Sequence, residues 1–337
     1  MSDALLIALF GISAVLSLCF SWVLVTALER VGARLGLTEA LLGMLAALAA
    51  DAPEVTAAVS ALAGHHSRIG AGVVIGSNVF NLAALLGLAA VIAGRIALHR
   101  RVIELNGAVA LWISVVCVLV VVGVLSPAAG LLAAGSVLAP YLAILGLRRE
   151  RLERLARMQL PAAWASWLSA AVAEEELELE PAIHPSRGGA RDGALAVVAV
   201  LAVVSASVAM EQTASKLGAR HAVPEIVTGA LLLAAVTSLP NAVAAVYLAA
   251  RGRGTAVLSA ALNSNAINVF AGLLLPATVV GLGAPSGQTT FVAAAYVGLT
   301  VLALVSSYIA SGLRRAHGAL VIAAYLGFVA VVLATAS

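Results

Sequence analysis

Two carboxylates lie close together in the middle of a long apolar stretch. Asp51 and Glu54 stand at positions i and i+3, a spacing that places both side chains on one face of a helix. Pro53 between them removes a helical hydrogen bond and leaves the Ala49 carbonyl oxygen free. Such oxygens together suit a hard cation such as Na⁺ or Ca²⁺, or a proton. In the alternative, structural interpretation, neighbouring helices hold Asp51 neutral.

A second proline segment offers neutral ligands in the same arrangement. Residues 237–241 read T-S-L-P-N, and Pro240 predicts the same helix break with a freed Val236 carbonyl. Ser238 and Asn241 take the positions of the two carboxylates on the equivalent face. Both segments therefore offer oxygen ligands, while the formal negative charge is confined to the first.

Amide side chains follow each proline segment. Residues 76–81 read G-S-N-V-F-N, and residues 263–268 read N-S-N-A-I-N. Asparagine is seldom placed in lipid without partners, so these segments are expected to pack against the proline segments with their oxygens pointing inward. Helix packing alone is the alternative role for these amides. The spacing from Gly72 to Gly76 favours close helix packing.

The elements that must position these groups are membrane helices. Of 337 residues, 62% are hydrophobic and 10% charged, against roughly 25% charged in an average soluble domain. Each apolar stretch can cross about 30 Å of hydrocarbon as a helix, and none has the alternation of a barrel strand. We predict an all-α polytopic membrane protein with ten transmembrane helices, at residues 4–27, 38–63, 69–94, 103–124, 127–147, 192–214, 225–250, 256–282, 289–311 and 317–335.

The basic residues predict the orientation of these spans. With the N-terminus outside, 16 of the 19 lysines and arginines fall in cytoplasmic loops. The exceptions are Arg68, Lys216 and Arg220. Both termini are then outside and the central loop is cytoplasmic, in an inner or plasma membrane. Near the outer end of the sixth span, Glu211 could shape an ion entrance or pair with Lys216 at the interface.

The two halves of the chain are related and inverted. A shift of 187 residues places Pro53 on Pro240 and Asn78 on Asn265. Each half contributes five spans, and because five is odd the second half starts on the opposite side of the membrane. Gene duplication in a structural membrane protein is the alternative. The predicted divisions are a first five-helix repeat at 1–147, a cytoplasmic linker at 148–191 and a second five-helix repeat at 192–337.

The linker is the one long polar segment. It carries Trp164 and Trp167 and an acidic run from Glu174 to Glu180. The pattern is equally consistent with an amphipathic helix anchored on the membrane surface by the tryptophans and with a solvated linker. The acidic run lacks the glycine and the ligand spacing of a calcium loop, so no site is assigned to it.

An interrupted segment followed by S-N-x-x-N occurs twice, and this pattern resembles the sodium/calcium exchanger family of calcium/cation antiporters, as a divergent prokaryotic-type member. The resemblance covers residues 38–94 and 225–282. It implies a central diamond of helices that binds Na⁺ or Ca²⁺ alternately, with Glu54 in the place of the first essential glutamate. The implied ligands are Asp51, Glu54, Ser77, Asn78, Asn81, Thr237, Ser238, Asn241, Ser264 and Asn268.

The chain departs from the family pattern at the acidic positions. Asn241 stands where the second glutamate is usual, and Ala50-Asp51 replaces the usual Thr-Ser of the first repeat. The site therefore keeps two carboxylates but places both in one half. This difference leaves the transported ions and their stoichiometry open.

These features predict a secondary active cation antiporter, sodium/calcium exchanger-like, with alternating access at a midplane site. Two carboxylates neutralise one Ca²⁺ or two monovalent ions. Because their charges repel, one proton could remain bound, so sodium/proton or calcium/proton antiport is the alternative.

A passive cation channel or an intramembrane enzyme would be a function of another class. An enzyme would need a further catalytic group, and the spans contain no histidine cluster or nucleophile beside a base. We expect no enzymatic activity and no cofactor. The expected partners are inorganic cations, as transported substrates, and the lipid bilayer, with no nucleic acid and no obligatory protein partner.

Overall fold

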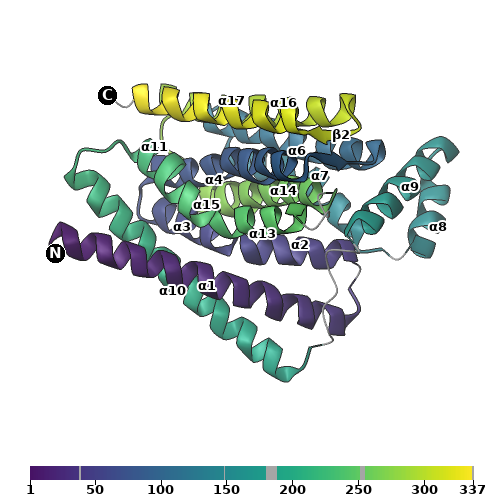
Figure 1. Ribbon diagram of the computed structural model, residues 1–337, viewed down its shortest axis with the longest axis horizontal. Helices are drawn as coiled ribbons and strands as arrows, with labels where there is room; N and C mark the ends of the chain where they lie inside the picture. The colour runs from purple at the N-terminus through teal and green to yellow at the C-terminus, as the bar shows by residue number, and fades with distance from the viewer. Residues whose placement is uncertain (38, 148, 180–187, 251–254, 336–337) are drawn as a thin grey trace.

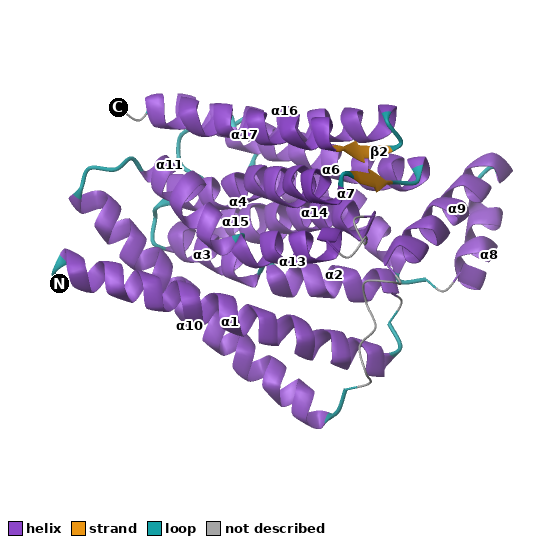
Figure 2. Cartoon of the chain, viewed as in Figure 1, coloured by secondary structure: helices purple, strands orange, loops and turns teal. Residues whose placement is uncertain are grey.

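The computed structural model describes the chain except residues 38, 148, 180–187, 251–254 and 336–337 (Figure 1). Nearly all of the described residues are helical (Figure 2). In the first half and the linker, the helices are α1 (Asp3–Leu35), α2 (Glu39–Ala50), α3 (Ala52–Ala63), α4 (Ser67–Asn81), the π-helical η1 (Leu82–Leu88), α5 (Ala89–Ala93), α6 (Arg100–Val121), α7 (Pro127–Leu145), α8 (Arg149–Gln159) and α9 (Ala162–Leu179).

The second half repeats this order of long and interrupted helices. It contains α10 (Ala190–Arg220), α11 (Glu225–Val227), the π-helical η2 (Thr228–Leu233), α12 (Ala234–Thr237), α13 (Leu239–Ala250), α14 (Thr255–Ile267), the π-helical η3 (Asn268–Leu274), α15 (Leu275–Val280), α16 (Gly287–Ile309) and α17 (Arg315–Ala334).

Eight continuous helical runs are long and apolar enough to cross a membrane, within the described residues. The second and seventh predicted spans are divided into shorter helices. The first of these breaks lies at Asp51 between α2 and α3, and the other lies at Ser238 between α12 and α13. A 12-residue helix such as α2 or α3 spans about 18 Å, so neither piece crosses the hydrocarbon alone.

A short β-ladder departs from the all-α prediction. Strand β1 (Arg95–Ala97) pairs in antiparallel fashion with β2 (Gly312–Arg314). Both strands are three residues long and lie directly before helices of different halves. Segments this short between helices carry no readable alternation, which is why the sequence pattern did not indicate them.

The helices form layers that enclose the motif segments. In Figure 1, α1 and α10 lie along one side of the molecule and α16 and α17 along the opposite side, with α4 and α14 between them. The runs Ser67–Ala93 and Val257–Val280 are buried over most of their length. Where α1 contacts α10, the hydroxyls of Ser17 and Ser207 are 2.8 Å apart.

Glycines allow two of the inner helices to approach closely. A Cβ at Gly72 would lie 3.0 Å from the backbone nitrogen of Ala230 in η2, and one at Gly76 would overlap the Ala230 backbone. The close packing expected from these two glycines is thus present between α4 and η2. It brings the amide segment of the first half against the proline segment of the second.

The linker folds into two helices that pack at the end of the bundle away from the N-terminus (Figure 1). Helix α9 contacts α6, α2 and α14. Trp167 donates to Glu104 at 3.0 Å, whereas Trp164 is exposed. Glu175 of the acidic run is completely buried, so this linker is more than a solvated connection.

Candidate functional site

Asp51 lies in the break between α2 and α3, with 0% of its surface exposed. Its Oδ1 atom accepts hydrogen bonds from Asn241 Nδ2 at 2.7 Å and from Ser264 Oγ at 2.8 Å. Its Oδ2 atom has no partner among the described residues. A buried carboxylate oxygen without a partner is costly unless a proton or cation occupies the position beside it.

Glu54 lies in the first turn of α3 and is equally buried. Its Oε1 accepts from Ser238 Oγ at 2.5 Å, and its Oε2 accepts from Asn268 Nδ2. Two carboxylates of the first half are thus held by four neutral donors, two from the proline segment and two from the amide segment of the second half.

The helix break also gives the Ala49 carbonyl a partner that was not anticipated. Ser21 of α1 donates to the Ala49 carbonyl at 3.2 Å and approaches the Ala50 carbonyl at 3.4 Å. The oxygen that Pro53 deprives of its helical partner is therefore not a free ligand, because it accepts this hydroxyl.

The remaining predicted residues lie in the same buried cluster but contact different partners. Ser77 and Thr237 face each other at 3.5 Å between hydroxyl oxygens, and neither has a hydrogen bond to a carboxylate among those described. Asn81 donates to Ser264 at 3.4 Å, while its Oδ1 has no partner among the described residues.

Asn78 joins the two halves through a reciprocal pair of hydrogen bonds. Its Nδ2 donates to the Asn265 carbonyl at 3.0 Å, and Asn265 Nδ2 donates to the Asn78 carbonyl at 3.1 Å. Asn265 was absent from the expected ligands. The 187-residue shift that pairs it with Asn78 was the signal that could have identified it.

Comparison with known proteins identifies the family of this chain. The model of the sodium/calcium exchanger protein family matches residues 5–148 and 193–334. The chain belongs to this family. Among curated proteins, none matches the sequence significantly.

Several solved structures share the fold at low sequence identity. An H⁺/Ca²⁺ exchanger, CAX, has a TM-score of 0.68 at 14% identity, with 98% of this chain and 86% of that chain covered. The sodium-calcium exchanger NCX_Mj has a TM-score of 0.59 at 20% identity, covering 98% and 99%. The structure of YfkE has a TM-score of 0.63 at 16% identity, covering 96% and 91%.

A second buried polar cluster in this exchanger was missed by the sequence interpretation. The Tyr141 hydroxyl donates to Asn106 Oδ1 at 2.5 Å and its oxygen lies 3.0 Å from Asn263 Oδ1, and Asn106 donates to Glu175 at 3.1 Å. Asn263 directly precedes the Asp51 partner Ser264. The acidic linker thus reaches the helix that carries part of the exchanger's central cluster.

The central cluster consists of oxygen-bearing side chains of the kinds that coordinate hard cations. Its described side chains are carboxylates, amides and hydroxyls, and no lysine, arginine or histidine bonds to Asp51 or Glu54 among those described. A hydroxyl or amide that now donates to a carboxylate can turn to present its oxygen. The same four second-half groups can therefore satisfy the carboxylates or coordinate a cation beside them.

Proposed function

We propose that this exchanger-family chain is a secondary active cation antiporter with alternating access at a central site formed by the ten residues of the cluster. The observation that supports it most directly is the burial of Asp51 and Glu54 against neutral donors of the other half. Ionisable groups at membrane depth are costly and mark ion pathways.

The proposed architecture is ten spans in two inverted five-helix repeats joined by the linker, with divisions at 1–147, 148–191 and 192–337. The interrupted spans supply the second and seventh helices. The reciprocal bonds between Asn78 and Asn265 are what a two-fold relation between the halves would produce. We propose an integral plasma-membrane protein with both termini outside and the linker in the cytoplasm.

The proposed exchange follows from charge. Without a cation the site carries two formal negative charges, and its four donors compensate them only in part, because Asp51 Oδ2 has no described partner. One Ca²⁺ or two Na⁺ neutralise the pair and allow the loaded site to reorient. The empty site is held back by the cost of moving uncompensated charge through a low-dielectric interior.

Na⁺ and Ca²⁺ are the favoured transported ions, because the available donors are the hard oxygen ligands that these cations prefer. A second candidate is Ca²⁺/H⁺ or Na⁺/H⁺ antiport. The similarity to an H⁺/Ca²⁺ exchanger favours it, as does the proximity of two carboxylates, which can share a proton.

Transport in proteoliposomes tests the proposal. Uptake of radiolabelled Ca²⁺ or Na⁺ should require an opposing gradient of Na⁺, Ca²⁺ or H⁺, and it should disappear in Asp51→Asn and in Glu54→Gln. Ser114→Ala is a matched control, because this buried hydroxyl donates only within α6 among the described contacts.

Other outcomes identify the alternatives. Flux that needs no opposing cation would indicate a channel. Unchanged exchange in both carboxamide variants would refute the site. Hydrolysis of lipid that is lost in Glu54→Ala would indicate an intramembrane enzyme.

A further inference from the structure

One buried carboxylate of the long apolar helices lies outside the central cluster. Glu211 stands within the long apolar helix α10 and is 2% exposed. It has no described hydrogen bond to any of the ten residues of the central cluster. A carboxyl group at membrane depth is expensive to retain, so a function is the default expectation.

Glu211 faces helix α3 of the first half. Its Oε2 accepts from Ser60 Oγ at 2.7 Å, and its Oε1 has no partner among the described residues. Ser215, one turn further along α10, has its hydroxyl beside the same carboxyl. One carboxylate and two hydroxyls therefore meet between α3 and α10, and the buried Oε1 atom of Glu211 has no hydrogen bond among the described contacts.

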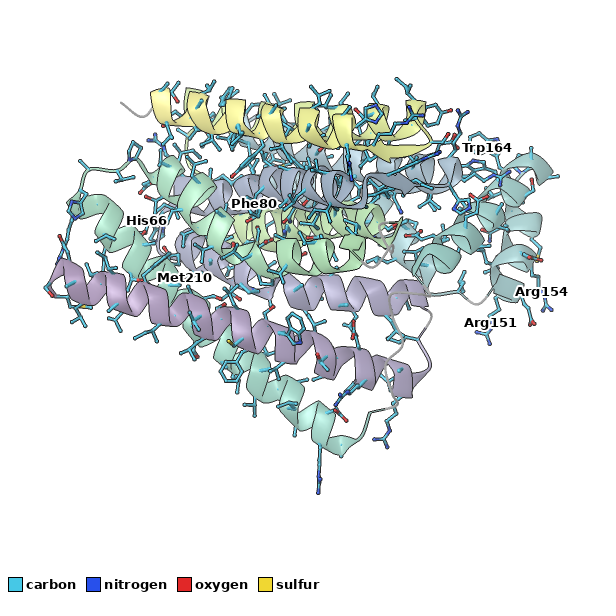
Figure 3. All side chains as sticks on the ribbon, in the orientation of Figure 1. His66, Phe80, Arg151, Arg154, Trp164 and Met210 are labelled. Carbon is cyan, nitrogen blue, oxygen red and sulfur yellow. The ribbon has the colours of Figure 1, made fainter. Side chains whose placement is uncertain are left out.

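The interfacial pairing with Lys216 does not account for this arrangement. Lys216 is exposed, and no ion pair between it and Glu211 occurs in the described part of the chain. The nearby His66 pairs instead with Glu225, at 3.1 Å. Figure 3 labels His66 and Met210, the residue before Glu211, on the same side of the molecule as the N-terminus.

Helix α3 connects this group to the central cluster. It begins beside Asp51, and Ser60 follows Glu54 by six residues, a rise of about 9 Å. From Ser60, α3 continues to its end at Ala63, and α10 ends at Arg220, which pairs with Asp3 near the N-terminus at 2.8 Å. Glu211 thus lies between the central cluster and the membrane face that carries the N-terminus.

Comparison of the halves shows what Glu211 adds. The 187-residue shift that aligns the two halves places Leu24 on Glu211. The second half, which supplies only neutral groups to the central cluster, therefore carries a carboxylate where the first half has an apolar side chain.

We propose that Glu211, with Ser60 and Ser215, forms a second cation-binding site on the route between the N-terminal face and the central site. It takes the same hard cations as the central site, held by one carboxylate and hydroxyl oxygens. The proposal rests on the proposed antiport for its role in transport, but the binding itself can be measured independently.

Equilibrium binding of Ca²⁺ to the purified full chain is the first test. The double variant Asp51→Asn, Glu54→Gln should retain one weak site, with Kd on the order of 10⁻⁴ to 10⁻³ M for so few ligands. Adding Glu211→Gln should abolish it, whereas adding Thr213→Val should not, because the Thr213 hydroxyl bonds only to the α10 backbone. Absence of binding in the double variant, or retained binding in the triple variant, would overturn the proposal.

Sided transport is the second test and needs only a single substitution. In Glu211→Gln the half-saturating cation concentration should rise about tenfold for cation supplied at the N-terminal face, which corresponds to one lost ligand interaction. The value at the opposite face and the maximal rate should change by less than about twofold. An equal shift at both faces, or no shift, would contradict the proposed site.

Failure of the proposed antiport can be distinguished from failure of the Glu211 site. Without antiport, the wild-type protein would show no gradient-dependent exchange, but the effect of Glu211→Gln on Ca²⁺ binding could still be measured.

Discussion

Asp51→Asn and Glu54→Gln should both abolish exchange but differ in stability. In Asp51 only Oδ1 accepts hydrogen bonds from described residues, while Oδ2 has none. Asparagine can keep Oδ1 and place its NH₂ group at the position of Oδ2, where an unpartnered neutral donor replaces an unpartnered charged oxygen. The substitution then removes a poorly compensated buried charge without breaking either bond, so stability should be equal to or above that of the wild type.

Glu54 offers no such position. Both of its oxygens accept, from Ser238 and from Asn268, so the NH₂ group of a glutamine must face a group that now donates. That group has to turn and accept, and its own hydrogen then loses the acceptor it has now, a net cost of about 1 kcal/mol. The free energy of unfolding should therefore be lower in Glu54→Gln than in Asp51→Asn by about 1 kcal/mol.

Thermal unfolding in detergent with a chelator measures this difference. The unfolding midpoint of Asp51→Asn should be equal to or above that of the wild type. The midpoint of Glu54→Gln should be the lowest of the three proteins. Added Ca²⁺ should raise the midpoint of the wild type, because ligand binds the folded state, with a smaller rise or none in the variants. Equal midpoints for the two variants, or a calcium response undiminished in Asp51→Asn, would refute this reasoning.

Three further changes test other parts of the structure. Asn241→Asp puts a third carboxylate beside Asp51, because Asn241 Nδ2 now lies 2.7 Å from Asp51 Oδ1. Two charges about 4 Å apart repel by roughly 4 kcal/mol at an effective dielectric of 20, so cation-free stability should fall, and competition binding should show a preference for Ca²⁺ over Na⁺. Gly76→Ala would overlap the Ala230 backbone, so it should destabilise the protein by at least about 2 kcal/mol and reduce the folded yield in size-exclusion chromatography. Glu175→Ala removes the buried linker carboxylate and should make α9 sensitive to limited proteolysis.

The polar clusters in the membrane spans were predictable because they contrast with their surroundings. Asp51, Glu54 and the two amide segments are polar residues within apolar runs, and the 187-residue shift aligns the two halves. The structure brings all ten predicted side chains into one buried region. Their role in binding cations stays a proposal.

Other features gave no such contrast. Ser21 is one of several serines in α1, so its bond to the Ala49 carbonyl could not be distinguished from ordinary helix packing. Glu175 lies in an acidic run typical of a solvated segment, yet it is buried against Asn106. Both contacts depend on how distant helices meet, which local residue patterns do not determine.

The unequal distribution of charge determines which side chains must rearrange when a cation binds. Asp51 and Glu54 have no donor capacity when ionised, whereas the four second-half groups can both donate and accept. At the proposed site, a cation between the halves would therefore leave the carboxylates in place and turn the four groups that now donate to them so that oxygens replace donors: Ser238, Asn241, Ser264 and Asn268.

The placement of both carboxylates in one half also explains how the transport of two cations would be coupled. The coupling would arise from the net charge of the site and not from the loss of contacts between the halves. The halves are joined by hydrogen bonds without the cation and by coordination with it, so contact persists in both conditions. What changes is the uncompensated charge, which is greatest when Asp51 Oδ2 has no partner. Neutralising both carboxylates by substitution should therefore remove the barrier to reorientation of the empty site, even though no cation can then be carried.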